Sequence, residues 1–166
     1  MGEPVTHHAT LVFDRTFEAP VERVFSALSD PVARAQWSAP SETAVLIYDQ
    51  ADFRIGGCDI FRCGTKSDPR YRGETRYCDI VPNRRIISIE TIDELETLLS
   101  AALATLELTP DGERTRLKLT VQLAALGDKR MIDGTKLGYA GALDNLARFL
   151  GGRLAPPPPG DDLIER

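Results

Sequence analysis

The most telling segment of this chain reads Phe13-Asp14-Arg15-Thr16-Phe17-Glu18-Ala19-Pro20-Val21-Glu22-Arg23-Val24-Phe25, and Asp30-Pro31 and Trp37 follow it. The Thr, Val and Phe content of residues 10–17 favours a β-strand. Pro20 suits the first position of a helix, where its missing N–H costs nothing. The segment therefore predicts a strand that ends at Ala-Pro and passes directly into a helix.

Two short helices are predicted between residues 20 and 37. The apolar residues that share one helical face in the first helix are Val21, Val24, Phe25 and Leu28. Asp30-Pro31 then repeats the start signal, with Asp as the N-cap and Pro as the first helical residue. We expect the helix to break there and to restart toward Trp37, the only tryptophan of the chain.

The hydrophobic period changes to two from Thr43 onward, which is typical of antiparallel strands. The expected strands are residues 43–49, 57–63, 71–81, 85–93, 98–109 and 114–124. Thr109-Pro110-Asp111-Gly112 predicts a turn, because Pro sets φ at the first corner and Gly tolerates positive φ at the exit. In the last strand leucine and valine alternate with polar residues from Arg116 to Leu123, so one face of the sheet should be buried.

A long C-terminal helix over residues 129–150 is expected to cover that face. Its apolar side chains at helical spacing are Tyr139, Ala142, Leu143, Leu146, Phe149 and Leu150. Gly134, Gly138 and Gly141 are poor helix formers, each costing about 1 kcal/mol relative to Ala. Small residues at these positions indicate either a close backbone approach or open space beside the helix.

Length and composition indicate one ordinary domain. The chain has 166 residues, of which 42% are hydrophobic, and a chain of that size buries about two-thirds of its unfolded surface without a disulfide or metal. We expect a flexible lead at residues 1–9, one domain at 10–154, and a disordered Pro-rich acidic tail at 155–166 that stays outside the fold. His7 and His8 lie in the lead, where solvation is expected rather than metal binding.

Charge and cysteine content narrow the location and the partners. The formal net charge of −5 offers no basic surface for nucleic acid, and no apolar run is long enough for membrane insertion. Cys58, Cys63 and Cys78 form no CxxC pair, and no segment resembles a signal peptide, so a cytoplasmic location is the simplest expectation. A homodimer is compatible with these features.

Several short motifs occur in the order found in a known family. They are Phe17-Glu18-Ala19-Pro20, Val24-Phe25, Asp30-Pro31, Trp37, Asp52-Phe53-Arg54-Ile55-Gly56-Gly57, Tyr77-Cys78-Asp79-Ile80-Val81-Pro82 with Arg85-Ile86, and Gly138-Tyr139 through Leu143-Asp144-Asn145-Leu146. As an ordered set across residues 10–150, they resemble the START/Bet v 1-like (SRPBCC) superfamily, in the branch named after the activator of the heat-shock protein 90 ATPase.

The resemblance implies an α+β helix-grip fold. In this fold a curved antiparallel sheet of six to seven strands wraps around the C-terminal helix, two short helices lie between the first two strands, and a hydrophobic cavity separates sheet and helix. The family includes proteins that bind lipid- and polyketide-like ligands, cyclases or hydrolases, and co-chaperones. The fold alone therefore does not choose a function.

Asp59 stands where the resemblance implies an aromatic residue facing the cavity. The alternate positions after Gly56-Gly57 are Asp59, Phe61 and Cys63. A carboxylate facing an apolar pocket is costly unless it is paired or solvated, and its pKa tends to rise, which makes Asp59 a candidate site residue. The alternative is a register shift of one residue, which would place Asp59 in water.

Glu90 is the second carboxylate of interest, because it shares a strand face with Ile86, Ser88 and Ile92. If that face points inward, Glu90 could pair with Asp59 or an arginine and support general acid–base chemistry. We favour the opposite orientation, in which Ile87 and Ile89 point inward and Glu90 is solvated.

Tyrosines and the single tryptophan complete the expected pocket. Tyr77 and Tyr139 each combine an apolar ring with a hydroxyl that could orient a ligand, although core packing is the alternative for both. Trp37 is expected near the cavity mouth unless it plugs the end of the sheet. The expected pocket-lining residues are Trp37, Asp59, Phe61, Cys63, Tyr77, Glu90, Tyr139 and Leu143.

Familiar catalytic motifs are absent from the sequence. It has no GxSxG elbow, HExxH pair, Walker loop or dinucleotide fingerprint, and both histidines lie in the lead, so histidine-dependent catalysis is excluded and no metal or cofactor is expected. Arg54 is expected to be a structural partner for Asp52. The cysteines are expected to be small buried hydrophobes, with neighbouring arginines leaving modest thiolate activation open.

The leading hypothesis is a module that binds a hydrophobic or aromatic small molecule between the sheet and the C-terminal helix. The alternative is a cofactor-free cyclase or hydrolase that uses Asp59, Glu90 or a tyrosine, and it requires carboxylates that are shielded from solvent. A third hypothesis is a co-chaperone-like interaction module. It predicts an exposed apolar or charged sheet surface and no enclosed cavity of about 300 Å³ or more.

Overall fold

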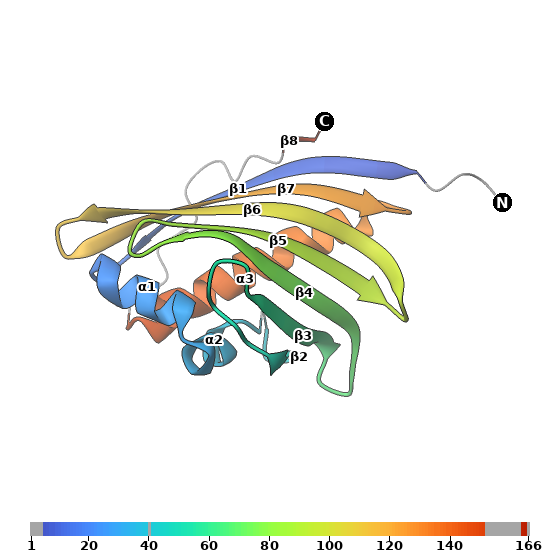
Figure 1. Ribbon diagram of the computed structural model, residues 1–166, viewed down its shortest axis with the longest axis horizontal. Coiled ribbons are helices and arrows are strands. Elements are labelled where there is room, and N and C mark those ends of the chain that lie inside the picture. The colour runs from blue at the N-terminus through green and yellow to red at the C-terminus, as the bar shows by residue number, and fades with distance from the viewer. Residues whose placement is uncertain (1–4, 40, 152–163, 166) are drawn as a thin grey trace.

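A curved antiparallel sheet and a long helix in its concave face make up the fold of the computed structural model, which describes residues 5–39, 41–151 and 164–165 (Figure 1). The strands are β1 (Thr6–Phe17), β2 (Ala44–Gln50), β3 (Cys58–Thr65), β4 (Asp68–Val81), β5 (Arg85–Glu94), β6 (Thr97–Asp111), β7 (Arg114–Leu126) and β8 (Ile164–Glu165), in the spatial order β2-β3-β4-β5-β6-β7-β1-β8. The helices are α1 (Val21–Ser29), α2 (Pro31–Trp37) and α3 (Arg130–Phe149). This arrangement confirms the predicted helix-grip fold.

Both ends of the chain differ from the sequence-based expectation. Residues 6–9 belong to β1 rather than to a flexible lead, because Thr6 pairs with Leu126 of β7 and Ala9 pairs with Leu123. His7 and His8 therefore lie on a strand. In the tail, Ile164–Glu165 pairs with β1 as β8. Val5 precedes β1, and its carbonyl accepts a hydrogen bond from the Gly127 N–H at 3.0 Å. The other residues assigned to the lead and the tail, 1–4, 155–163 and 166, lie outside the described residues.

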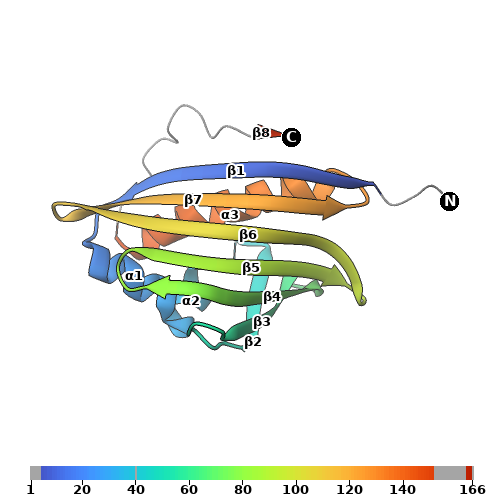
Figure 2. The same cartoon turned by 45° about the horizontal axis from the view of Figure 1, so that its top comes forward.

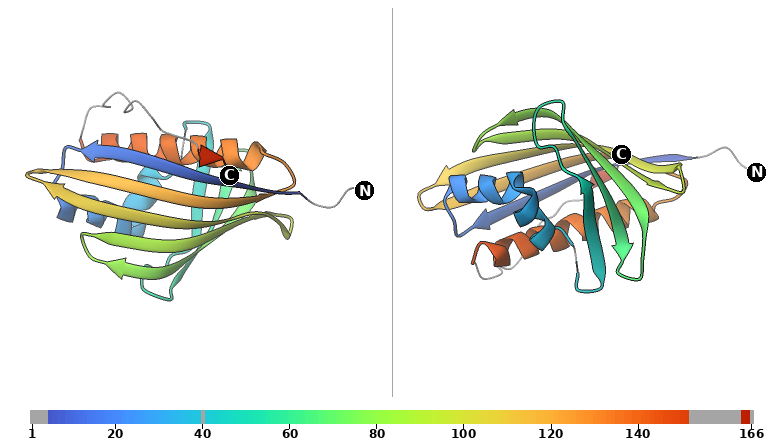
Figure 3. Two further views of the ribbon diagram at one scale, coloured as in Figure 1. Left: turned by 90° about the horizontal axis from the view of Figure 1, so that it is seen from above. Right: turned by 60° about the horizontal axis from the view of Figure 1, so that its bottom comes forward.

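Local sequence explains why two short helices close one end of the sheet. Pro20 is the N-cap of α1 rather than its first residue, with φ −66° and ψ 155°. Asp30 caps α2 as predicted, because its carboxylate accepts a hydrogen bond from the Val32 N–H at 3.1 Å and Pro31 is the first helical residue. Figures 2 and 3 show α1 and α2 at one end of the concave face, beside the C-terminal half of α3.

The six predicted internal strands all overlap observed strands, but the β6–β7 turn comes later than expected. Pro110 is still paired in β6, opposite Thr115, and Asp111 pairs with Arg114. The corner is therefore formed by Gly112 and Glu113, and Gly112 takes the positive φ of 61°. A two-residue hairpin turn needs positive φ, which glycine adopts freely, so glycine rather than proline sets the corner.

Strand register aligns the inward-facing side chains into rows that cross the sheet. One row runs Asp59, Thr75, Glu90, Ala102, Leu123 and Ala9, and the next runs Tyr77, Ser88, Ala104, Val121 and Leu11. The first row is polar over β3–β5 and the second over β4 and β5, and both are apolar over β6, β7 and β1. The packed core lies over the apolar part, where Phe13, Leu117 and Leu146 are almost completely buried.

Candidate ligand-binding cavity

A cavity of about 840 Å³ lies between the concave face of the sheet, α2 and α3. Small-molecule sites typically have volumes of about 300–1,000 Å³. The lining includes all eight residues expected from the sequence: Trp37, Asp59, Phe61, Cys63, Tyr77, Glu90, Tyr139 and Leu143. The structure thus brings these side chains together around one space.

The glycines of α3 leave room for this cavity. Gly134 and Gly138 both line it. A Cβ atom added at either position would meet no other heavy atom within 4 Å. Of the two explanations that the sequence left open, open space therefore applies here, and a close backbone approach does not.

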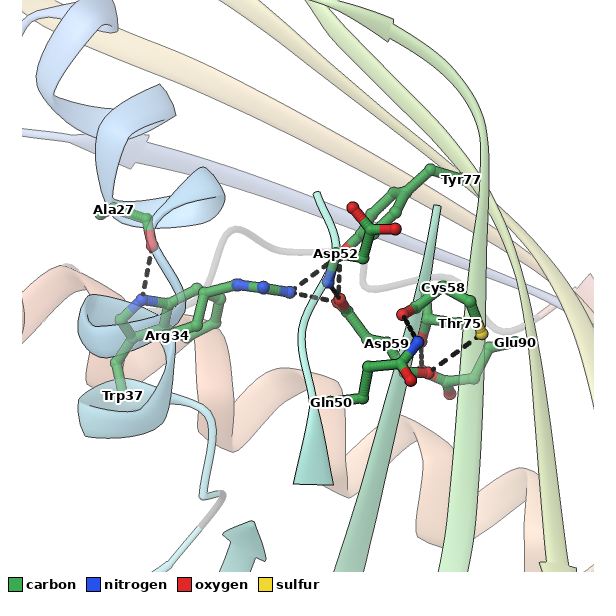
Figure 4. A network of polar contacts seen from close by, with 10 residues as sticks. All are labelled: Ala27, Arg34, Trp37, Gln50, Asp52, Cys58, Asp59, Thr75, Tyr77 and Glu90. Atoms are coloured by element: carbon green, nitrogen blue, oxygen red, sulfur yellow. Dashed lines mark hydrogen bonds and ion pairs between the residues drawn. The ribbon is translucent and has the colours of Figure 1, made fainter. Parts of the chain in front are cut away.

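Arg34, Asp59 and Tyr77 form a buried polar cluster at the α2 end of the cavity (Figure 4). Arg34 Nη1 pairs with Asp59 Oδ2 and donates a hydrogen bond to the Tyr77 hydroxyl at 2.8 Å. The Tyr77 hydroxyl donates in turn to Asp59 Oδ2, while Asp59 Oδ1 accepts from the Asp52 N–H at 2.8 Å. Every carboxylate oxygen of Asp59 is thus engaged, which explains how a carboxylate that is 1% exposed is accommodated.

Burial and charge act in opposite directions on this cluster. Burial alone would lower the pKa of Arg34, but the hydrogen bond and charge of Asp59 raise it overall, so the guanidinium stays charged. Burial raises the pKa of Tyr77 well above its usual range despite the nearby Arg34. The Tyr77 hydroxyl is therefore a proton donor and not a base at neutral pH. The Tyr48 ring covers the guanidinium, with its centroid 4.8 Å from Cζ.

The inward orientation of Asp59 follows the predicted register, whereas sequence reasoning missed Arg34. Arg34 is 5% exposed, and among the described residues no acceptor reaches its Nε and Nη2 atoms. A buried aspartate requires a cation, and Arg34 lies one turn before Trp37 on the same helix. That spacing relative to a residue already assigned to the cavity was the available signal.

Glu90 faces the cavity, so our favoured orientation for β5 is wrong. Ile86 and Ser88 are buried, whereas Ile89 is 44% exposed on the opposite face. The physical reason is that isoleucine occupies both faces of β5, since Ile87 is also half-buried. Alternating hydrophobicity could not identify the inner face.

The surroundings of Glu90 differ from those of Asp59. Thr75 Oγ1 donates a hydrogen bond to Glu90 Oε2 at 3.5 Å, and Tyr139 of α3 also hydrogen-bonds to the carboxyl group. Burial raises the pKa of Glu90 to about 7, although both of these hydrogen bonds lower it. Glu90 therefore pairs with neither Asp59 nor an arginine in the described residues, and it can gain or lose a proton near neutral pH.

The other predicted residues combine lining and packing roles. Trp37 Nε1 donates to the Ala27 carbonyl at 3.0 Å, which ties α2 to α1 while the indole borders the cavity. The Tyr139 ring packs 5.9 Å from that of Phe13, between the core and the cavity. Phe61 fills the hollow above Gly73, where an added Cβ would meet the Phe61 ring at 2.0 Å. Any side chain at position 73 would displace the Phe61 ring, which lines the cavity, so this part of the lining requires glycine there.

Thiol and metal chemistry find little support in this site. Burial raises the pKa of Cys63 to about 11, so its thiol is protonated at neutral pH. Arg54 Nε contacts both carboxylate oxygens of Asp52 at 3.0 Å, as expected for a structural pair.

Within the described ranges, no three His, Cys, Asp or Glu side chains are grouped so that they could hold a metal ion. None of the described helices is long and apolar enough to cross a bilayer.

Fold and cavity together define a helix-grip protein with a cavity between its curved sheet and its C-terminal helix. The chain belongs to the family described as Activator of Hsp90 ATPase homolog 1-like protein, whose model matches residues 18–151. This membership confirms the resemblance seen in the ordered motifs.

Solved bacterial structures share the fold along nearly their whole length. An uncharacterised protein from Rhizobium leguminosarum is 33% identical, with a TM-score of 0.76 over 90% of this chain and 99% of the other. A protein from Rhizobium loti is 31% identical, with a TM-score of 0.75 over 89% and 99%. A Chromobacterium violaceum protein is 25% identical, with a TM-score of 0.73 over 87% and 98%. No curated protein matches this chain.

Proposed function

We propose that this protein binds an apolar or aromatic small molecule in the cavity between the sheet and α3. The observation that carries the proposal is a space of about 840 Å³ beside a closely packed core. Protein interiors contain few voids larger than a water molecule, because unfilled space forfeits packing energy. Gly134 and Gly138 keep this space open although glycine lowers the stability of the helix. This cost favours the interpretation that the space holds a ligand.

Binding would depend mainly on apolar contact. Each 200 Å² of apolar ligand surface removed from water contributes about 5 kcal/mol, before the cost of association is subtracted. Polar groups on β3–β5 would set the orientation, since the Tyr77 hydroxyl and the Glu90 carboxyl border the same space as the apolar side chains. A few polar groups within an apolar lining are typical of specific small-molecule sites.

A cofactor-free enzyme is the second candidate, and Glu90 is the observation that favours it. Its raised pKa of about 7 suits a general acid or base near neutral pH. Asp59 is a weaker candidate, because its oxygens are already engaged by Arg34, Tyr77 and the Asp52 N–H. The co-chaperone hypothesis predicted no enclosed cavity of about 300 Å³ or more, and a cavity of about 840 Å³ counts against it.

The proposal can be tested by native mass spectrometry and by titration with the neutral fluorophore N-phenyl-1-naphthylamine. Gly138 is near the middle of the cavity-facing residues of α3, so Gly138→Leu should narrow the space. We expect a co-purified small molecule or probe binding in the wild type, and at least tenfold weaker binding in Gly138→Leu. Leu137→Phe is the matched control, because Leu137 is 72% exposed.

Two results would overturn the proposal. One is the absence of both a co-purified molecule and probe binding in the folded wild-type protein. The other is equal probe affinity in wild type, Gly138→Leu and Leu137→Phe, which would show that the probe binds elsewhere. Circular dichroism of each variant checks that the fold is retained.

A further inference from the structure

The charged side chains around the cavity are almost completely balanced against one another. Among the described residues, the charged lining consists of three arginines and four acids: Arg34, Arg70, Arg130, Asp59, Glu90, Glu94 and Asp128. Arg34 pairs with Asp59 inside the cavity. Arg70 and Glu94 approach to 3.4 Å, and Arg130 and Asp128 approach to 2.7 Å.

Of these four acids, Glu90 is the one without an arginine partner in the part of the chain that the structure describes. Within the described residues, the contacts of its carboxyl group are the Thr75 hydroxyl and the Tyr139 hydroxyl, and no cation pairs with it. The Arg70 and Arg130 side chains are more than half exposed and already paired. The cavity therefore presents one uncompensated acid on a wall that is otherwise neutral.

The groups that surround Glu90 do not titrate near neutral pH. Tyr139 on α3, Tyr48 on β2 and Cys63 on β3 all interact electrostatically with Glu90, and burial raises the pKa of each. Asp59, two strands away in the same row, forms an ion pair with Arg34. β4 and β6 place the uncharged Thr75 and Ala102 directly beside Glu90. A change of charge between pH 6 and 8 in this region is therefore a change at Glu90.

We propose that the ligand of this cavity is an apolar or aromatic amine, and that its ammonium group pairs with Glu90. This inference rests on the proposed function and names the ligand class. A buried carboxylate is stabilised by a cation that donates charge-assisted hydrogen bonds. Aromatic rings add to this, because Phe61 and Tyr139 line the same cavity and ring faces attract cations.

A matched pair of probes tests the ligand class. 1-Naphthylmethylamine carries an ammonium group, and 1-naphthalenemethanol is its uncharged counterpart of similar size. Their affinities are measured by isothermal titration calorimetry at pH 6 and pH 8. At pH 8, where Glu90 is ionised, we expect the amine to bind at least tenfold more tightly than the alcohol.

The pH dependence supplies a second readout that needs no variant. A carboxyl group with a pKa of about 7 must lose its proton before it can pair with the amine. The affinity for the amine should therefore be about tenfold lower at pH 6 than at pH 8. The affinity for the alcohol should not increase over this range, because it gains no ion pair.

Glu90→Gln keeps the size of the side chain and removes its charge. We expect this variant to lose both the preference for the amine and its pH dependence. Glu94→Gln is the matched control, since Glu94 also lines the cavity but is already paired with Arg70. This control should retain at least half of the wild-type preference.

The outcomes separate the inference from the function on which it rests. Equal binding of amine and alcohol by the wild type, or an amine preference that survives in Glu90→Gln, would overturn the amine assignment while leaving a small-molecule site in place. If neither naphthyl probe nor N-phenyl-1-naphthylamine binds the folded protein, the proposed function fails and the amine assignment falls with it.

Discussion

Asp59→Asn is the substitution that examines the buried cluster most directly. The change keeps the size of the side chain but removes the negative charge that Arg34 pairs with. It also places an N–H₂ group where an acceptor is required, because Oδ1 accepts from the Asp52 N–H and Oδ2 accepts from Arg34 and Tyr77. Either orientation of the new amide sets a donor against a donor.

The expected loss follows from the burial of both partners. Arg34 is 5% exposed, so the guanidinium would be left as an uncompensated charge away from water. Breaking a buried pair by removing one partner costs about 3–5 kcal/mol. A domain of this size has a free energy of unfolding of about 5–15 kcal/mol, so the variant would lose a large share of its stability.

Urea unfolding followed by Trp37 fluorescence provides the assay, because the indole lies in the same cavity wall as the cluster. The double variant Arg34→Met/Asp59→Leu should recover most of the loss, since apolar replacement of a buried pair is often neutral or stabilising. Asp49→Asn breaks an exposed pair with Arg62 and should change little. A loss below about 1 kcal/mol in Asp59→Asn would refute the reasoning that the ion pair is buried.

Three further predictions concern the cavity wall. Gly138→Ala should raise the free energy of unfolding by about 1 kcal/mol in urea titration, because the added methyl meets open space; a loss would indicate a hidden contact. Folding raises the pKa of Glu90 from 4.5 to about 7, so the folded protein holds this proton more tightly than the unfolded chain does. The protonated carboxyl group therefore stabilises the fold, fully below pH 4.5. This stabilisation is lost as the pH rises through 7. Unfolding curves at several pH values should show wild type losing on the order of 3 kcal/mol relative to Glu90→Gln over this range, and parallel curves would contradict the raised pKa. At pH 8, iodoacetamide should modify the exposed Cys78 well before Cys63, whose pKa burial raises to about 11; equal rates in peptide mass spectrometry would contradict that burial.

Features that depend on neighbouring residues could be predicted from the sequence. The break between α1 and α2 follows from the Asp30 cap and Pro31, which act within one turn. The inward orientation of Asp59 came from the family resemblance, which places the alternate positions after Gly56-Gly57 on the cavity side, because counting positions alone leaves either strand face open. The helix break depends on backbone geometry over a few residues, so a single sequence contains the information needed to predict it.

Features that depend on distant pairing could not be predicted in the same way. Arg34 and Asp59 are 25 residues apart in the chain and lie on different elements, α2 and β3, so their pairing depends on how the helix packs against the sheet. The inner face of β5 is set by its neighbours β4 and β6, because its own isoleucines occupy both faces. The start of β1 at Thr6 depends on the length of β7.

The contrast between the two halves of α3 has a dynamic consequence. Leu143, Leu146 and Leu150 anchor the second half in the core. In the first half Ile132 is also buried, but Gly134 and Gly138 add no side-chain contacts. Segments with few packed contacts open locally at a small fraction of the free energy needed for global unfolding. We therefore expect the first half of α3 to open locally more readily than the hydrogen-bonded sheet. The rate of this opening should then set how long a bound molecule stays in the cavity.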